Sequence, residues 1–384
     1  MLTYSVKPRG GVVHAVEVSE ALARRGHAVE LAALARPGEA LFRPTTVPLH
    51  VVRHVPVDAP FDERIEAMLT AYADGLRPIL GAGGYEVVHA QDCLSANAAL
   101  ELRAQGIVDQ VIRTVHHVDD FTSPSLVECQ HRSIAEPDHV LCVSQPWVDR
   151  LARDFGVRAE LVCNGVDTRR FRPPRDAAER SAARAAVGAG DRFVVLTVGG
   201  IEPRKGSLTL LDGFAALRAA APRLDPLLVI AGGTTLFDYR HEREQFDARV
   251  AALGVGEHVR VLGPQAPAAI ESLFRAADVF AFPSVKEGFG LAALEALAAE
   301  LPVVASDLDV FRGFLADGES ALLAPTGDGG ALAAALARVA REPALRDRLR
   351  AGGRRVADAY TWDVSAATHE GAYAAFRLSE ASAA

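Results

Sequence analysis

Short apolar runs rich in β-branched residues alternate along the chain with longer stretches of Ala, Leu and Arg. This alternation predicts parallel βαβ units, and the near-continuous apolar character of the runs fits strands buried on both faces of a sheet. The predicted strands are residues 28–35, 86–90, 110–115, 139–143 and 159–163 in the first half, and residues 193–198, 227–231, 259–262, 279–281 and 302–305 in the second. We therefore expect an α/β protein with two Rossmann-like, doubly wound parallel sheets.

A proline pair and a helical stretch separate the two sets of strands. The pair lies in Phe171-Arg-Pro-Pro-Arg175, before the helical residues 176–187. Since proline cannot continue a helix and stiffens a connection, we place the domains at residues 1–172 and 173–357. The tail, residues 358–384, is expected to be a helix that packs back on the first domain. Only five residues precede Val6 and the first Gly loop, so the first strand is expected to be clipped.

Composition narrows the class of protein. The length of 384 residues favours two domains, and a net charge of −8 argues against a nucleic-acid partner. The four cysteines form no C-x-x-C pair, which favours reduced thiols in a cytoplasmic protein. No signal peptide and no apolar run of about 20 residues is evident, although peripheral membrane contact stays open.

The loop after the strand at 279–281 carries the chemistry we expect of a ligand site. Open α/β sheets bind ligands outside the carboxyl ends of their strands, so two such sheets are expected to face a shared cleft. Here Gly288 and Gly290 open onto a helix, whose N-terminal N–H groups and dipole favour a phosphate. Glu295 lies about 7 Å into that helix, where a carboxylate can accept from both ribose hydroxyls. Glu287 lies at the other end of the diphosphate, where a sugar ring would sit.

Several collinear motifs carry a resemblance to a known family. Residues 282–306 resemble the E-x7-E region of glycosyltransferase family 4, the retaining group 1 glycosyltransferases of the GT-B fold, related to glycogen synthase and mannosyltransferases. Further matches are Gly10-Gly11, Val88-His-Ala-Gln-Asp92, Thr114-Val-His116, Cys163-Asn-Gly-Val-Asp167 with Phe171-Arg-Pro173, and Ala277-Asp-Val-Phe280. The resemblance covers almost the entire chain.

The resemblance assigns roles to these residues. It implies that Glu295 holds the ribose, that Glu287 holds hydroxyls of the transferred sugar, and that His116 contacts that sugar or the developing oxocarbenium ion. The other expected donor-binding residues are Gly10, Gly11, Gly288, Phe289, Gly290 and Leu291, with Leu262 near the base. The fold is expected to need no metal, and Asp119 and Asp120 lack the D-x-D spacing of a metal site.

The second phosphate clamp departs from the family pattern. Family members commonly carry an arginine where Gly200 stands and a lysine five residues later. This chain keeps Lys205, and Arg204 is the candidate to supply the missing charge.

We therefore expect a hexosyltransferase that moves sugar from a nucleotide-diphosphate donor to a hydroxyl acceptor by front-face substitution. UDP-, GDP- and ADP-sugars all stay open as donors, and the acceptor is unknown. The alternatives are a GT-B epimerase or hydrolase acting on the nucleotide sugar itself, and a non-catalytic nucleotide-sugar-binding protein. A Rossmann oxidoreductase fits less well, because Gly10-Gly11 lacks G-x-G-x-x-G spacing.

Overall fold

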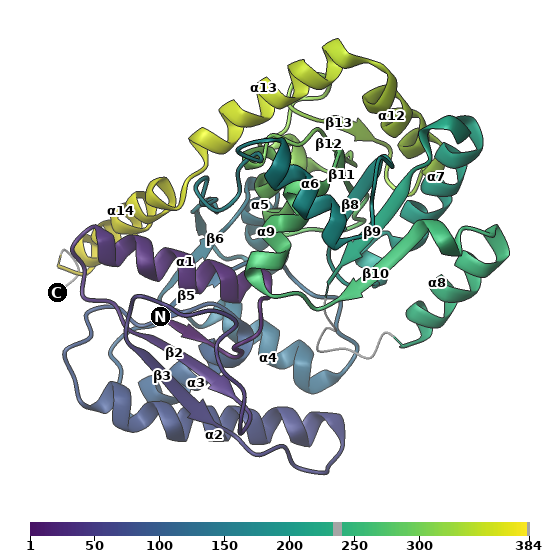
Figure 1. Cartoon of the computed structure of the whole chain (residues 1–384). Helices are drawn as coiled ribbons and strands as arrows, with labels where there is room; N and C mark the ends of the chain where they lie inside the picture. Colours follow the sequence, from purple (N-terminus) through teal and green to yellow (C-terminus); the bar gives the residue numbers. More distant parts are fainter. Residues whose placement is uncertain (233–239, 382–384) are drawn as a thin grey trace. The chain divides into compact units, whose positions relative to one another are not determined.

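The computed structural model describes residues 1–232 and 240–381, which divide into two compact units (Figure 1). Unit 1 comprises Met1–Asn164 and the C-terminal segment from Trp362, and unit 2 comprises Gly165–Thr361. The first boundary between the two units, between Asn164 and Gly165, therefore lies before the proline pair. It does so because Val166 is tied to the end of unit 2, where it bridges Thr361 and its N–H donates to the Tyr360 carbonyl at 2.9 Å.

Unit 1 is built on a seven-stranded parallel sheet in the order β3-β2-β1-β4-β5-β6-β7. Its strands are β1 Leu2–Thr3, β2 Leu31–Ala35, β3 Leu49–Arg53, β4 His89–Ala90, β5 Ile112–Val115, β6 His139–Cys142 and β7 Ala159–Leu161. Leu2 pairs with Ala32 on one side and with Ala90 on the other, so the short β1 is central. The strand order reverses between β1 and β4, where open sheets of this type bind ligands.

The helices of unit 1 are α1 Gly10–Arg24, α2 Phe61–Gly81, α3 Cys93–Ala104, α4 Pro124–Ala135, α5 Gln145–Phe155 and α14 Trp362–Ala381. The last of these returns to lie beside the first (Figure 1). Trp362 is buried, and Arg25 forms an ion pair with Glu370 at 2.6 Å. The final helix thus completes unit 1. Our expected tail extends to residue 384, and its last three residues lie outside the described part of the chain.

Unit 2 is built on a six-stranded parallel sheet in the order β10-β9-β8-β11-β12-β13. The strands are β8 Val194–Val198, β9 Leu227–Ala231, β10 Val259–Gly263, β11 Val279–Phe282, β12 Val303–Ser306 and β13 Leu322–Ala324. The helices are α6 Ala177–Ala186, α7 Ser207–Ala220, α8 Arg240–Leu253, α9 Pro267–Ala276, α10 Leu291–Ala298, α11 Asp309–Arg312, α12 Gly329–Arg341 and α13 Pro343–Ala359, with 3-10 turns η1 Pro203–Lys205, η2 Pro222–Leu224 and η3 Gly256–His258. Phe214, Leu228 and Leu336 lie in a core between sheet and helices.

The ten predicted strands all appear, with ends that shift by up to three residues. The first strand, expected to be clipped, is the two-residue β1, and two further strands were not predicted, β3 and β13. Both lie at sheet edges, and β3 carries the polar residues His50 and Arg53 within a partly exposed run. An edge strand has neighbours on one side only, so its apolar signal is weak.

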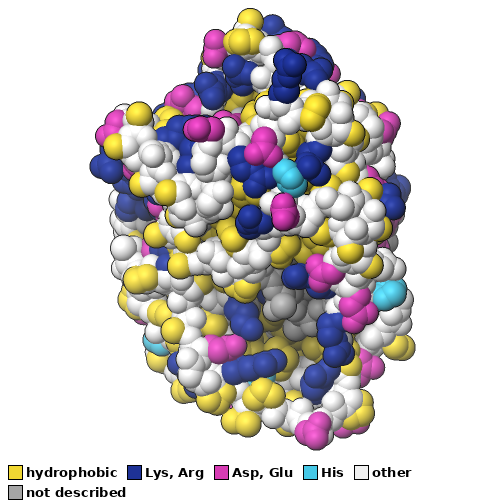
Figure 2. Space-filling view, turned by 45° about the vertical axis from the view of Figure 1, so that its right-hand side comes forward, with side chains coloured by type: hydrophobic (Ala, Val, Ile, Leu, Met, Phe, Trp, Pro, Cys, Tyr) yellow, Lys and Arg dark blue, Asp and Glu magenta, His cyan; other side chains and the backbone are white. Residues whose placement is uncertain are grey.

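Basic and acidic side chains are interspersed over the face seen in Figure 2. None of the helices within the described residues combines the length and the apolar character that crossing a bilayer requires.

Candidate functional site

The start of α10 is shaped by glycine. Gly290 is the N-cap and has φ +109°, a conformation that favours glycine. A Cβ at this position would come within 2.6 Å of Cε1 of Phe311. Because a glycine cap brings no side chain to the first-turn N–H groups, the helix N-terminus can receive an anion.

Glu287 lies at the centre of a charged cluster next to this helix. Lys205 Nζ donates to Glu287 Oε1 at 2.5 Å, and Ser284 Oγ donates to the same oxygen at 2.8 Å. Arg204 Nη1 lies 3.7 Å from Glu287 Oε2, while its Nη2 is 3.3 Å from the buried Glu202. The structure therefore brings three of the predicted site residues, Lys205, Arg204 and Glu287, into one group.

The cluster keeps Glu287 ionised. Its side chain is only 8% exposed, and burial by itself would raise the pKa of this carboxyl. The charges of Lys205 and Arg204 outweigh burial and hold the pKa below its usual value. At neutral pH the carboxylate is therefore a hydrogen-bond acceptor for hydroxyl groups.

Backbone contacts fasten the two loops of the cluster to each other. The Arg204 carbonyl accepts from Val285 N–H at 2.7 Å and from Lys286 N–H at 3.3 Å. Gly206, at φ +64°, lies so close to the Pro283 carbonyl that an added Cβ would be 2.0 Å from its oxygen. The loop after β8 and the loop after β11 are thus joined by backbone hydrogen bonds and close packing.

The remaining predicted residues of unit 2 have separate surroundings. Phe289 is buried and stacks on Phe314 at 4.9 Å between ring centroids, so its side chain is structural. Glu295 is partly buried on α10. The Leu262 carbonyl accepts from the Gln265 side chain at 2.8 Å. Gly288 and Leu291 bound the turn into α10.

In unit 1, the predicted residues Gly11 and His116 are in contact. His116 follows β5, and Gly11 lies in the first turn of α1. A Cβ on Gly11 would lie 3.2 Å from His116 Cδ2, whereas nothing lies within 4 Å of one on Gly10. The glycine at position 11 therefore lets the helix approach the imidazole ring.

A group of buried histidines next to His116 was not predicted from the sequence. The ring of His14 lies 4.9 Å from that of His116 and 5.3 Å from that of His369. His14 Nδ1 also bonds Asn164 Oδ1 at 2.6 Å, and burial lowers the pKa of His14 to about 3. A signal was present, because His14 follows Gly10 and Gly11 by one helical turn on the same face.

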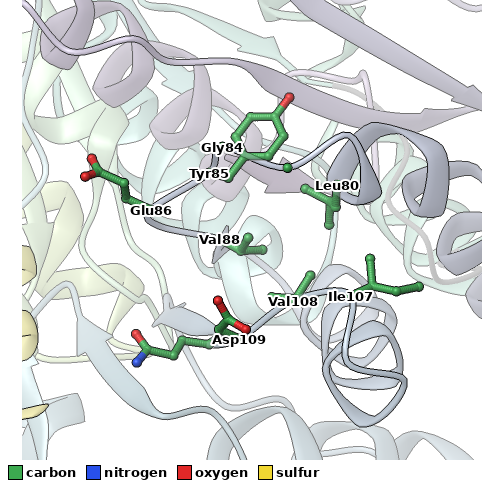
Figure 3. A pocket seen from close by; sticks show the side chains of 10 residues that line it. Leu80, Gly84, Tyr85, Glu86, Val88, Ile107, Val108 and Asp109 are labelled. Atoms are coloured by element: carbon green, nitrogen blue, oxygen red, sulfur yellow. The ribbon is translucent and has the colours of Figure 1, made fainter.

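A pocket of about 290 Å³ lies elsewhere in unit 1 (Figure 3). Its lining includes Tyr85, Val88 and Asp109, which precede β4 and β5. It is therefore at the amino ends of the strands, at the opposite edge of the sheet from His116. None of the predicted site residues lines it.

The expectation about metals concerns Asp119 and Asp120. Asp119 lies 3.2 Å from the His117 ring nitrogen. Among the residues that the structure describes, no three His, Cys, Asp or Glu side chains are grouped so that they could hold a metal ion.

Comparison with known families shows to which family the chain belongs. Residues 8–170 match Glycosyltransferase Family 4, and residues 179–356 match Glycosyl transferases group 1. The chain belongs to the family 4 glycosyltransferases. It is a glycosyltransferase that uses a nucleotide-sugar donor, and the predicted family is confirmed.

The relatives and solved structures match almost the entire length of the chain. The chain is 33% identical to a D-inositol 3-phosphate glycosyltransferase of Saccharomonospora viridis, covering 97% of this chain and 91% of the relative. It is 32% identical to a phosphatidyl-myo-inositol mannosyltransferase of Mycobacterium leprae, covering 94% and 92%. The sucrose-phosphate synthase of Thermosynechococcus elongatus superposes with a TM-score of 0.79 at 23% identity over 98% of both chains. The predicted GT-B fold is therefore confirmed.

Proposed function

We propose that this glycosyltransferase moves a hexose from a nucleotide diphosphate to a hydroxyl acceptor with retention of the anomeric configuration. The observation that carries the proposal is the cluster of Glu287, Lys205 and Ser284 beside the uncapped N-terminus of α10. It combines an acceptor for sugar hydroxyls with a cation and helix N–H groups for phosphate. Glu295, further along α10, is assigned to the ribose.

The proposed reaction is a front-face substitution. The bond from C1 of the sugar to the phosphate oxygen breaks, and a bond from C1 to the acceptor oxygen forms on the same face. The departing phosphate oxygen takes the proton of the acceptor hydroxyl. Lys205, Arg204 and the α10 N-terminus stabilise the charge of the leaving diphosphate, which is why no divalent cation is assigned a role.

The acceptor is proposed to be an inositol that carries phosphate. Support comes from the names of two relatives, a D-inositol 3-phosphate glycosyltransferase and a phosphatidyl-myo-inositol mannosyltransferase. The acceptor in the first name is a small polyol phosphate, and the acceptor in the second is a lipid. The two acceptors share the inositol phosphate group. Lys7 and Arg9, just before α1, are candidate phosphate contacts in unit 1.

The test is a transfer assay with radiolabelled UDP-, GDP- and ADP-sugars, each with inositol phosphate, phosphatidylinositol or a neutral polyol. We expect one donor to label an inositol phosphate and the product to keep the anomeric configuration, as read by NMR. Label that leaves the nucleotide equally fast without an acceptor would instead support the epimerase or hydrolase. Donor binding without transfer to any acceptor would support a non-catalytic binding protein.

Glu287→Gln provides the residue-level check. The amide keeps the size of the side chain but removes the charge that Lys205 neutralises, so transfer should fall about 100-fold or more. Glu244→Gln is the matched control, because Glu244 is exposed on α8, and it should transfer at the wild-type rate. Equal activity of both variants would contradict the assignment of Glu287.

A further inference from the structure

A chain of polar side chains runs through unit 1 from the C-terminal helix to His116. The Tyr373 hydroxyl on α14 lies 2.7 Å from His89 Nδ1. His89 Nε2 lies 3.1 Å from Gln91 Nε2, and Gln91 Oε1 lies 3.0 Å from His116 Nε2. Gln91 is buried, with 1% of its surface exposed, and lies just after β4. The chain therefore connects α14, β4 and β5 behind the ring that sequence analysis assigned to the donor sugar.

The contacts of Gln91 define the direction of this chain. Besides His89, the Gln91 Nε2 group lies 2.9 Å from Met1 Sδ. An amide N–H can donate to a thioether sulfur, whereas an amide oxygen in that place would face another acceptor. The side-chain amide therefore donates towards His89 and turns its oxygen to His116.

Proton positions on the two imidazoles follow from this orientation. His89 Nε2 accepts from Gln91 and also lies 2.7 Å from Thr114 Oγ1, so its proton is on Nδ1 and is donated to Tyr373. His116 must donate to Gln91 Oε1, so its proton is on Nε2. The second ring nitrogen of a neutral imidazole is then an acceptor.

We propose that Gln91 is a positioning residue that holds His116 in the tautomer with its proton on Nε2, so that Nδ1 accepts a hydrogen bond from a hydroxyl of the donor sugar. This inference rests on the proposed function, because the hydroxyl belongs to the nucleotide sugar. Gln91 itself does not touch the substrate in this arrangement. His89 acts one step further away and Tyr373 two steps, by fixing the orientation of the Gln91 amide.

Two further features keep His116 in this state. Gly11 packs beside the ring, where an added Cβ would lie 3.2 Å from Cδ2 and 3.3 Å from Nε2. Burial, followed by the influence of His14, Arg113, His117 and His369, holds the pKa of His116 well below its usual value. These are the titratable groups that face the ring from α1, β5, its own loop and α14. The imidazole is therefore neutral at physiological pH and able to accept.

The first test reads the tautomer directly in the full-length protein without any donor. Long-range ¹H–¹⁵N NMR of histidine side chains separates protonated from unprotonated ring nitrogens, and His116→Asn identifies the His116 signals. We expect Nε2 of His116 to be protonated and Nδ1 not. Tyr373→Phe, a change three contacts away from the ring, should shift His116 towards the other tautomer. A proton on Nδ1 in the wild type would overturn the inference.

The second test is kinetic. Gln91→Glu puts a carboxylate beside the ring, which raises the pKa of His116. The kcat of this variant should fall about 10-fold from pH 8 to pH 6, relative to the same ratio for the wild type, since a protonated Nδ1 cannot accept. Gln91→Leu should lower kcat at both pH values without this added slope. A Gln91→Glu profile parallel to the wild type would contradict the role of Gln91.

These tests separate the inference from the proposed function. A wild-type tautomer as expected, in a chain that transfers no sugar, would count against the proposed function alone. Transfer with a flat Gln91→Glu profile, or with His116 protonated on Nδ1, would count against the inference alone. Since the NMR measurement uses the wild type, it remains decisive even where a variant folds poorly.

Discussion

At the scale of single residues, the proposed diphosphate clamp depends on which neighbour supplies the charge that Gly200 lacks. Gly200 offers no charge, and Arg204 lies where it contacts both Glu202 and Glu287. Two acidic side chains thus share the guanidinium with any phosphate that enters. An arginine at position 200 would approach the phosphate from a different part of the backbone. Unlike Arg204, it would not have to give up contacts with Glu202 and Glu287 to bind the phosphate.

The assignment of Arg204 leads to a rescue experiment. Arg204→Gln should raise the KM for the nucleotide sugar about 10-fold or more, because a charge-assisted contact to phosphate is lost. Adding Gly200→Arg to this variant should reverse much of the increase in KM. Arg223→Gln, a substitution of an arginine in η2, is the matched control. Steady-state kinetics would contradict the assignment if Arg204→Gln left the KM unchanged.

Sequence reasoning could identify Glu287 and Lys205 separately but not their ion pair. Both residues lie in recognisable motifs, yet they are 82 positions apart, and only the packing of the two loops brings them together. The same holds for His14 and His369, which come from opposite ends of the chain. Periodicity reports which face of a helix is buried, and it does not report what a buried imidazole will meet.

At the scale of elements, the site of unit 2 depends on two neighbouring strand–loop–helix units. The loops after β8 and β11 are joined through the Arg204 carbonyl and the close contact of Gly206 with Pro283. Together they hold Lys205 and Glu287 in register.

Gly206→Ala should break this connection. The new Cβ would meet the Pro283 oxygen at 2.0 Å, and the backbone has φ +64°, so we expect a loss of about 2 kcal/mol or more in unfolding free energy. Donor affinity should fall with it. Gly371→Ala is the control, since nothing lies within 4 Å of its Cβ, and it should be neutral or slightly stabilising. Urea unfolding and calorimetric titration measure the two effects.

Elements buried on both faces were predicted best. The strand at 227–231 matches β9 at both ends, because every one of its residues is buried and apolar. In contrast, β13 has three residues at a sheet edge, too few to show a period. The reversal of strand order at β1 rests on pairings between distant segments, which local patterns do not contain.

At the scale of the whole molecule, burial of neutral histidines makes stability depend on pH. His14 and His369 are fully buried, and burial lowers the pKa of His14 to about 3 and that of His369 to about 4. In the unfolded chain both titrate near 6.5. At pH values between the folded and unfolded pKa the unfolded state binds more protons. The contribution of these two histidines to the unfolding free energy is therefore fully present above about pH 7 and declines as the pH falls.

Urea unfolding at pH 7 and pH 5 checks this expectation. Each of the two histidines should cost about 2 kcal/mol over that interval, which stays above the range where most carboxylates titrate. His369→Leu should reduce the loss by about that amount. His241→Leu, an exposed site on α8, should leave it unchanged. A wild-type protein equally stable at both pH values would contradict the neutral, buried state of these rings.

The return of α14 to unit 1 also bears on the order in which the protein is made. A ribosome releases Met1–Asn164 first, but this unit lacks Trp362, His369 and Tyr373 until the end of synthesis. Unit 2, encoded by one continuous segment, can finish folding before the unit that was begun earlier. A chain that terminates early would therefore carry a complete Glu287 cluster but no Tyr373 contact to His89. Incomplete translation products would therefore contain the proposed donor cluster of unit 2 but lack the α14 side chains that pack around His89 and His14.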